Sequence, residues 1–144
     1  MSTKANAIRG HVAAKPGSRP GIESFGGIDQ PPPPGEVSVQ WHDYGIDKVH
    51  FEETGDLEKL CASTPSADMP VRWVNVVGLH PFVVNRLRQT YGIHTLAAED
   101  VLRTSQRPKL EAFDDHLFVV VRILTLNEGV LQQEQVSIFL FRDT

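Results

Sequence analysis

Several features are scarce in this chain of 144 residues. A single cysteine, Cys61, excludes an internal disulfide framework and a cysteine-rich zinc site, and it agrees with a reducing compartment. The net charge of −4 gives no basic footprint, so nucleic acid is not an expected partner. The longest apolar run, Leu117–Val121, is far shorter than the roughly 18 residues of a membrane span. No apolar segment follows the first basic residues, so we expect no signal peptide and a soluble, cytoplasmic chain.

Glycine and proline are concentrated in residues 1–35, which hold six of the eleven glycines and six of the ten prolines. Apolar residues in this segment stand singly, so it can bury little apolar surface to offset the entropy lost on ordering. Its charge is +2, against −6 for residues 36–144. We predict that residues 1–35 form a disordered Gly/Pro-rich tail, with Pro31–Pro34 as a stiff spacer. The same run satisfies the PxxP pattern of an SH3 ligand, but a plain linker is the simpler interpretation.

Residues 36–144 carry the patterns of one small folded domain. Alternating or continuous apolar residues predict strands at 36–41, around 49–51, at 71–77, at 117–126 and at 136–141. Capping residues and stop signals predict helices after Asp56, from Pro81 to Gly92, and from the cap Thr95 to Leu102. Residues 117–126 are apolar on both faces, which predicts a central strand paired with the last strand. This order predicts an α/β or α+β fold with a mixed β-sheet and helices packed on its faces.

Signatures of the common enzyme classes are absent, since the sequence has no glycine-rich phosphate loop, no HExxH pair and no GxSxG nucleophile. The run Asp114–His116 could serve in acid–base chemistry, although such a cluster more commonly forms a polar turn. The segment 106–109 could bind an anion through its two cations, or simply connect a helix to a strand. We prefer the turn and the connection, and we predict that the chain is not an enzyme.

Two adjacent carboxylates, Glu99 and Asp100, stand in the predicted helix among small and apolar residues. Neighbouring helical residues point about 100° apart, so the two side chains diverge instead of forming a bidentate pair. They could serve two neighbouring metal sites, or one site shared through water, and Mg²⁺ prefers oxygen ligands with retained waters. The alternative is a solvated helix face whose acids lie favourably near the helix N-terminus.

Longer stretches of the second half carry a resemblance to a known family. The matching motifs, in order, are Trp73–Asn75, Gly92–Leu102, Gln106–Glu111, Asp115–Val120 and Glu134–Leu140. Together they resemble the CorA family of Mg²⁺/Co²⁺ transport proteins, over residues 71–144 and more weakly over 36–70. Thr95 departs from the family pattern, which usually has proline there, and Ala98 stands where a larger apolar residue is common.

The resemblance implies a homopentamer whose protomers have a cytoplasmic α/β domain, a long stalk helix and two transmembrane helices. Because the family's Gly-Met-Asn pore signature is missing, residues 36–144 are expected to be the cytoplasmic domain alone, truncated before the stalk. It would lie at the inner face of the cell membrane, which it would meet only through the missing helices. Residues matching Glu99 and Asp100 take part in regulatory divalent-cation sites between protomers of the family, with partner carboxylates from the absent stalk. Bound Mg²⁺ is then expected to favour the closed pentamer.

Three hypotheses follow. The leading one is a divalent-cation-sensing regulatory domain of a magnesium/cobalt transporter or channel, with Mg²⁺, Co²⁺ or Zn²⁺ at Glu99 and Asp100. A zinc-transporting branch shares the architecture, so the transported ion stays open. The second is a free-standing soluble interaction module of the same fold, which would not respond to divalent ions. The third, a hydrolase using Asp114, Asp115 and His116, is the weakest.

Overall fold

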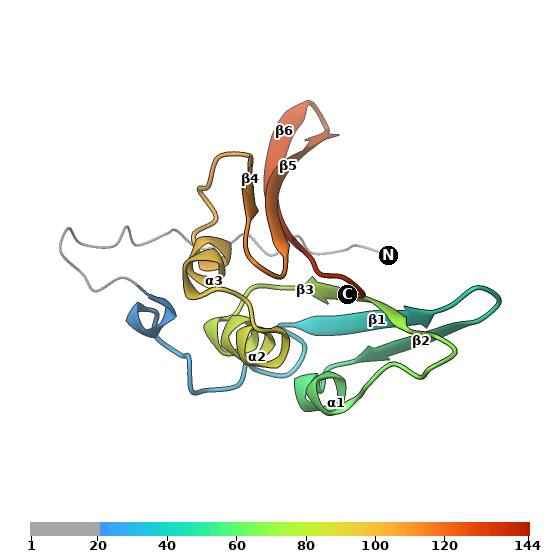
Figure 1. The fold of residues 1–144 in the computed structure, drawn as a ribbon. Coiled ribbons are helices and arrows are strands. Elements are labelled where there is room, and N and C mark those ends of the chain that lie inside the picture. Colours follow the sequence, from blue (N-terminus) through green and yellow to red (C-terminus); the bar gives the residue numbers. More distant parts are fainter. Residues whose placement is uncertain (1–20) are drawn as a thin grey trace.

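The computed structural model describes residues 21–144, and residues 1–20 lie outside the described part (Figure 1). A short 3-10 helix, η1 (Ile22–Ser24), precedes the strands β1 (Ser38–Tyr44) and β2 (Val49–Thr54) and the helix α1 (Leu57–Ala62). The strand β3 (Val71–Val77) leads to the helices α2 (Pro81–Tyr91) and α3 (Thr95–Leu102). The strands β4 (Lys109–Ala112), β5 (Leu117–Asn127) and β6 (Val130–Leu140) follow.

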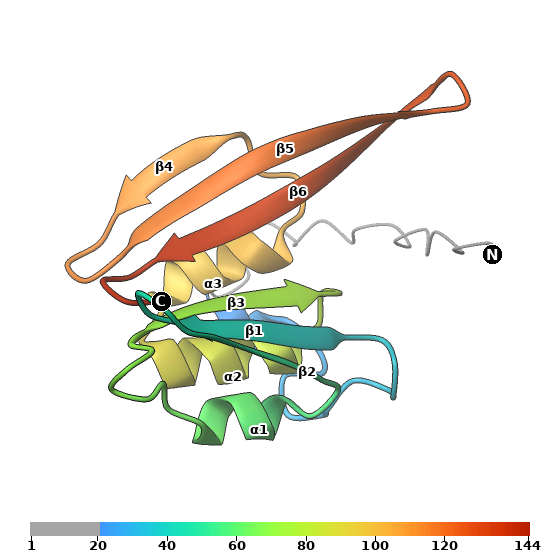
Figure 2. The ribbon, with the colours of Figure 1, turned by 90° about the vertical axis from the view of Figure 1, so that its right-hand side faces the viewer.

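The strands form two antiparallel sheets of three strands each, in the orders β2-β1-β3 and β4-β5-β6. Figure 2 shows α1 and α2 on one face of the first sheet, and α3 against the second. The predicted α+β class is therefore confirmed. The arrangement differs from one mixed sheet, because β3 and β4 are separated by α2 and α3 and join different sheets. All strand pairs within residues 21–144 are antiparallel.

The first sheet has one buried face because β1 alternates between buried and accessible residues. Val39 and Trp41 point to the buried face, where they pack against Leu57 and Leu60 of α1 and Val83 of α2. This cluster holds α1 and α2 against the sheet.

Histidine caps begin both longer helices. The ring of His80 accepts the backbone N–H of the second residue of α2 at 3.3 Å, and Pro81 takes the first helical position. Gly92 ends α2 in the left-handed conformation, with φ 71°. His94 caps α3 through the same contact, also at 3.3 Å. The predicted cap, Thr95, is therefore wrong by one residue, because the helical hydrogen bonds already begin at His94, whose carbonyl accepts the Ala98 N–H at 3.0 Å.

Strand β5 is the centre of the second sheet, as predicted. Phe118 and Val120 in its first half are buried, whereas residues 123–127 are exposed. The second half is not covered because the β5–β6 hairpin extends beyond α3 (Figure 2). Glu128 and Gly129 form its two-residue turn with φ angles of 48° and 80°, the backbone that a tight hairpin requires.

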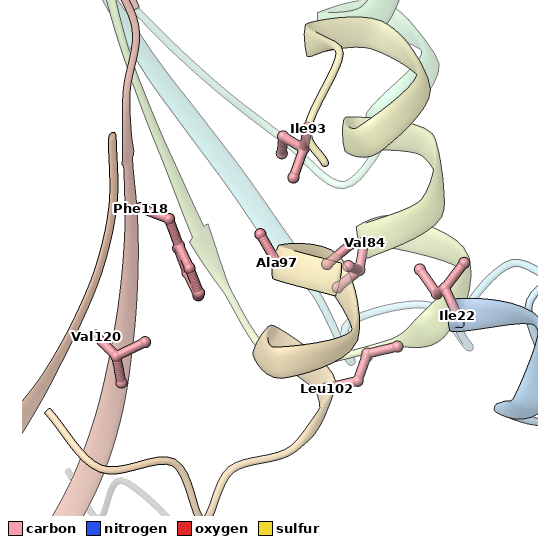
Figure 3. Packing of buried hydrophobic residues seen from close by; sticks show 8 residues of the cluster. Ile22, Val84, Ile93, Ala97, Leu102, Phe118 and Val120 are labelled. Carbon is pink, nitrogen blue, oxygen red and sulfur yellow. The ribbon is translucent and has the colours of Figure 1, made fainter. Parts of the chain in front are cut away.

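The larger hydrophobic cluster joins α2, α3, β5 and the N-terminal segment (Figure 3). Its buried members are Ile22, Val84, Ile93, Ala97, Ala98, Leu102, Phe118 and Val120. Phe118 and Val120 reach from β5 toward α3, and Ile22 enters next to Val84 of α2 (Figure 3). The alanines of α3 leave room for the Phe118 ring, so α3 can lie close to the sheet.

Residues 21–28 belong to this core, whereas the sequence analysis predicted disorder throughout residues 1–35. Ile22 is 0% exposed, and Phe25 and Ile28 pack against the same cluster. Ile22 lies in η1, whereas Phe25 is the C-cap of that helix and Ile28 lies in the turn that follows. The disorder prediction is therefore wrong for residues 21–28, while its part for residues 1–20 lies outside the described residues.

We expect the substitution Ile22→Ala to lower the free energy of unfolding by about 2 kcal/mol. This is the lower end for such a core substitution, because the N-terminal segment can shift into the space left behind. Urea denaturation followed by circular dichroism measures the change. Ile46→Ala is the matched control, because Ile46 is fully exposed. Equal stability of the two variants would show that residues 21–28 do not contribute to the core.

Candidate metal centre

The second half of α3 carries the two predicted site residues, Glu99 and Asp100. The buried apolar side of this helix is formed by Ala97, Ala98 and Leu102. The two carboxylates have different contact partners, as the predicted divergence of their side chains requires. They do not lie at the helix N-terminus, so the helix dipole does not explain them.

Glu99 is a buried carboxylate with both oxygens engaged. Its side chain is 7% exposed, and Oε1 forms an ion pair with Arg103 one helical turn further along. Oε2 accepts the backbone N–H of Gly21 at 2.9 Å. A buried charge requires such partners. Glu99 thus ties the N-terminal segment to α3, and it can bind a cation only after Arg103 or Gly21 moves away.

Asp100 is half-buried and more accessible than Glu99, with 23% of its side chain exposed. Its Oδ1 accepts a hydrogen bond from Gln106 Nε2 at 2.8 Å, and its Oδ2 contacts Lys109 Nζ at 2.5 Å. The same ammonium donates to Glu111 Oε1 at 2.9 Å. One lysine on β4 therefore bridges two carboxylates.

The position of Lys109 favours a positive charge. Its Nζ lies 5.3 Å from the centroid of the Phe118 ring, where the negative face of the ring attracts a cation. Burial lowers the pKa of Lys109, but hydrogen bonds to Asp100 and Glu111 outweigh it and raise the pKa above its ordinary value. Lys109 is therefore an ammonium at neutral pH.

The segment 106–109 connects α3 to β4, as preferred from the sequence, and its Gln106 and Lys109 contact the chain's own Asp100. The sequence did not indicate that Lys109, Gln106 and Glu111 would be neighbours of Asp100 or of its lysine. The loop is held in place because Arg122 of β5 donates to the Gln106 carbonyl at 2.6 Å. The positive charge of Lys109 is visible in the sequence, but its pairing with Asp100 depends on the fold.

An open hollow of about 580 Å³ lies between α3 and β4. It is lined by Leu96, Glu99, Asp100, Arg103, Glu111, Ala112 and Phe113. Within residues 21–144 there is no group of three or more His, Cys, Asp or Glu side chains placed to hold a metal. Mg²⁺ commonly takes one or two carboxylates and keeps several waters. Asp100 and Glu111, already converging on one ammonium, fit that donor set, whereas Glu99 does not without a rearrangement.

The run Asp114–His116 does not form an accessible acid–base pair. Asp115 Oδ1 contacts His116 Nδ1 at 2.5 Å. The imidazole is buried and lies against the rings of Phe113 and Phe141, at centroid distances of 4.8 and 4.7 Å. Its Nε2 is buried and has no hydrogen-bond partner in the described part of the chain. Because that nitrogen cannot reach a substrate, the geometry gives no support to the hydrolase hypothesis.

Known proteins match this chain over much of its length. A profile of the family described as "CorA-like Mg2+ transporter protein" matches residues 69–144. The chain is 31% identical over 139 residues to the "Cobalt/magnesium transport protein CorA" of Thermotoga maritima, covering 92% of this chain and 37% of that protein. It is 36% identical over 72 residues to the "Putative metal ion transporter YfjQ" of Bacillus subtilis, covering 50% of this chain and 22% of that protein.

Fold and site together define an α+β domain with an acidic hollow beside a short helix. This chain belongs to the CorA-like Mg²⁺ transporter family, as the motifs of its second half predicted. It spans less than two fifths of the length of either relative. None of the helices between residues 21 and 144 has the length and hydrophobicity needed to cross a bilayer. Membership of a transporter family is consistent with the prediction that the chain is not an enzyme.

Proposed function

We propose that this chain is the cytoplasmic regulatory domain of a CorA-like Mg²⁺/Co²⁺ transporter, and that it senses divalent cations through Asp100 and Glu99. The observation that carries the proposal is the position of Asp100. Its carboxylate is partly exposed at an open hollow, and a lysine ammonium bridges it to Glu111. Family membership supports Mg²⁺ as the cation, while Co²⁺ and Zn²⁺ can bind the same oxygens.

The proposed mechanism follows from charge. Asp100, Glu99 and Glu111 carry three negative charges around one hollow against the two positive charges of Arg103 and Lys109, and the remaining negative charge would make equivalent copies of the domain repel one another there. A divalent cation bound to Asp100 of one protomer and to oxygens of a neighbour removes this repulsion and favours the state that brings them together. Glu99 joins the site when Arg103 releases it. Loss of the cation frees the domains, which is how the cation level would set the balance between a closed and an open pentamer.

The substitution Asp100→Asn tests this proposal, because it keeps the size and removes the charge. We expect it to weaken Mg²⁺ binding to the chain at least about tenfold, measured by isothermal titration calorimetry. Mg²⁺-dependent self-association, followed by sedimentation velocity, should disappear with it. Asp68→Asn is the matched control, since Asp68 also pairs with a lysine, Lys48, but at a distant exposed position. That control should retain the response of the unmodified chain.

Other outcomes separate the alternatives. An unchanged Mg²⁺ response in the double variant Glu99→Gln, Asp100→Asn would contradict the site. An unmodified chain that forms a defined oligomer with no response to any divalent ion would contradict the sensing role and favour the free-standing module. A clear preference for Zn²⁺ over Mg²⁺, lost in Asp100→Asn, would keep the site and favour the zinc-transporting branch.

A further inference from the structure

We propose that Lys109 is an internal competitor for the divalent cation, and that Glu111 is the second carboxylate over which the two compete. This inference rests on the proposed cation site at Asp100. It goes beyond it by assigning roles to two residues of β4 and by explaining what sets the affinity of the site.

The contacts of Lys109 are those of a bound cation. Nζ lies 2.5 Å from Asp100 Oδ2 and 2.9 Å from Glu111 Oε1, and the Phe118 ring lies beneath it at 5.3 Å. Three separate groups thus converge on one positively charged nitrogen. A divalent cation that binds both carboxylates must take the place of this ammonium, because the two would otherwise lie side by side with like charge.

Charge balance favours the exchange when the divalent ion is abundant. Asp100 and Glu111 together carry two negative charges, of which one lysine neutralises one. A divalent ion neutralises both. Lys109 can move away from the two carboxylates. Its side chain is 24% exposed, its ammonium is carried on a flexible four-carbon chain, and β4 is an edge strand.

The competitor weakens binding by a predictable factor. A ligand whose site is available for only part of the time has its apparent dissociation constant raised in inverse proportion to that fraction. If Lys109 occupies its position for roughly nine-tenths of the time, apparent affinity falls about tenfold. The lysine would then set the cation concentration at which the domain responds, without itself binding the ion.

The substitution Lys109→Met tests the inference, because methionine keeps an unbranched apolar stem and removes the charge. We expect Mg²⁺ to bind this variant about tenfold more tightly than the unmodified chain, by calorimetric titration. Lys109→Arg, which keeps a cation between the carboxylates, should show no such gain. Lys59→Met is the matched control for net charge. Lys59 lies in α1, away from the proposed site, and pairs with Glu52 at 2.7 Å on the surface. Thermal unfolding without Mg²⁺ confirms that each variant is folded, and Lys109→Gln serves if the methionine variant is not.

The same calorimetric titration also tests the role of Glu111. Adding Glu111→Gln to Lys109→Met should remove the gain in affinity. Equal affinities of Lys109→Met and the unmodified chain would overturn the competitor role even where Asp100→Asn abolishes binding, so that the proposed function stands. A gain that is the same in Lys59→Met, or that persists with Asp100→Asn, would show a general charge effect and also overturn it. Binding that Asp100→Asn leaves unchanged in the unmodified chain removes the proposed function itself.

Discussion

Replacing Asp43 by alanine is expected to lower the free energy of unfolding by about 3–5 kcal/mol. Asp43 and Arg72 form a buried ion pair across β1 and β3, with side chains 8% and 3% exposed. The guanidinium donates from Nε to Oδ1 at 2.6 Å and from Nη2 to Oδ2 at 2.7 Å. The variant leaves the arginine charge buried without its carboxylate. Asp43 raises the pKa of Arg72 in the intact protein, chiefly through these hydrogen bonds, so the guanidinium is always charged. Urea denaturation measures the loss.

The charge explanation has its own test. Adding Arg72→Met to Asp43→Ala should restore much of the stability, because no unpaired charge remains in the interior. A double variant no more stable than Asp43→Ala would contradict this explanation and point to the other contacts of Arg72, such as its bond to the Ser63 carbonyl at 3.0 Å. Glu58→Ala, which breaks an exposed pair with Arg86, is the control and should change little.

Local signals in the sequence predicted the elements that depend on few residues. The valine-rich run 71–77, bounded by Pro70 and Gly78, is β3. Pro81 and Gly92 bracket α2, because a proline suits the first helical position and a glycine adopts the left-handed conformation that ends a helix. Asp56 caps α1 by accepting the Glu58 N–H at 3.0 Å, as predicted.

Features that depend on distant contacts were missed. The four-residue strand β4 is an edge strand with charged residues, and it exists because β5 pairs with it. Ile22 is buried because α2 and α3 meet beside it, which the glycine-rich composition around it concealed. The candidate site likewise combines residues that the sequence indicates with contacts that depend on the fold. Glu99 and Asp100 could be selected from the sequence, but their different degrees of burial and the bridging Lys109 follow from the chain reversal between α3 and β4.

Phe118→Ala is expected to lower the free energy of unfolding by about 3–5 kcal/mol, as for other buried phenylalanines. Phe118 is 0% exposed, and its ring stacks on Phe139 of β6 at a centroid distance of 4.7 Å. Ala97 of α3 faces the ring (Figure 3), and the small side chains of Ala97 and Ala98 in the same cluster cannot fill the space that the ring would leave. Denaturant unfolding measures the loss. Val49→Ala, at an exposed position of β2, is the control and should change far less.

Phe118→Leu separates the packing of this ring from its electrostatic role. Leucine keeps most of the apolar volume, so the loss of stability should stay below about 1.5 kcal/mol. It also removes the aromatic face beneath Lys109 Nζ, an attraction of about 0.5–1 kcal/mol at a partly exposed site. If Lys109 competes with the divalent cation, a weaker attraction of the ammonium to its position should tighten Mg²⁺ binding about two- to fivefold. This change has the same direction as that of Lys109→Met but is smaller. Unchanged Mg²⁺ affinity in a stable Phe118→Leu variant would mean that the ring supports the core alone. Tighter binding would show that the hydrophobic core and the cation site share one residue, through which packing in the core sets the response of the hollow above it.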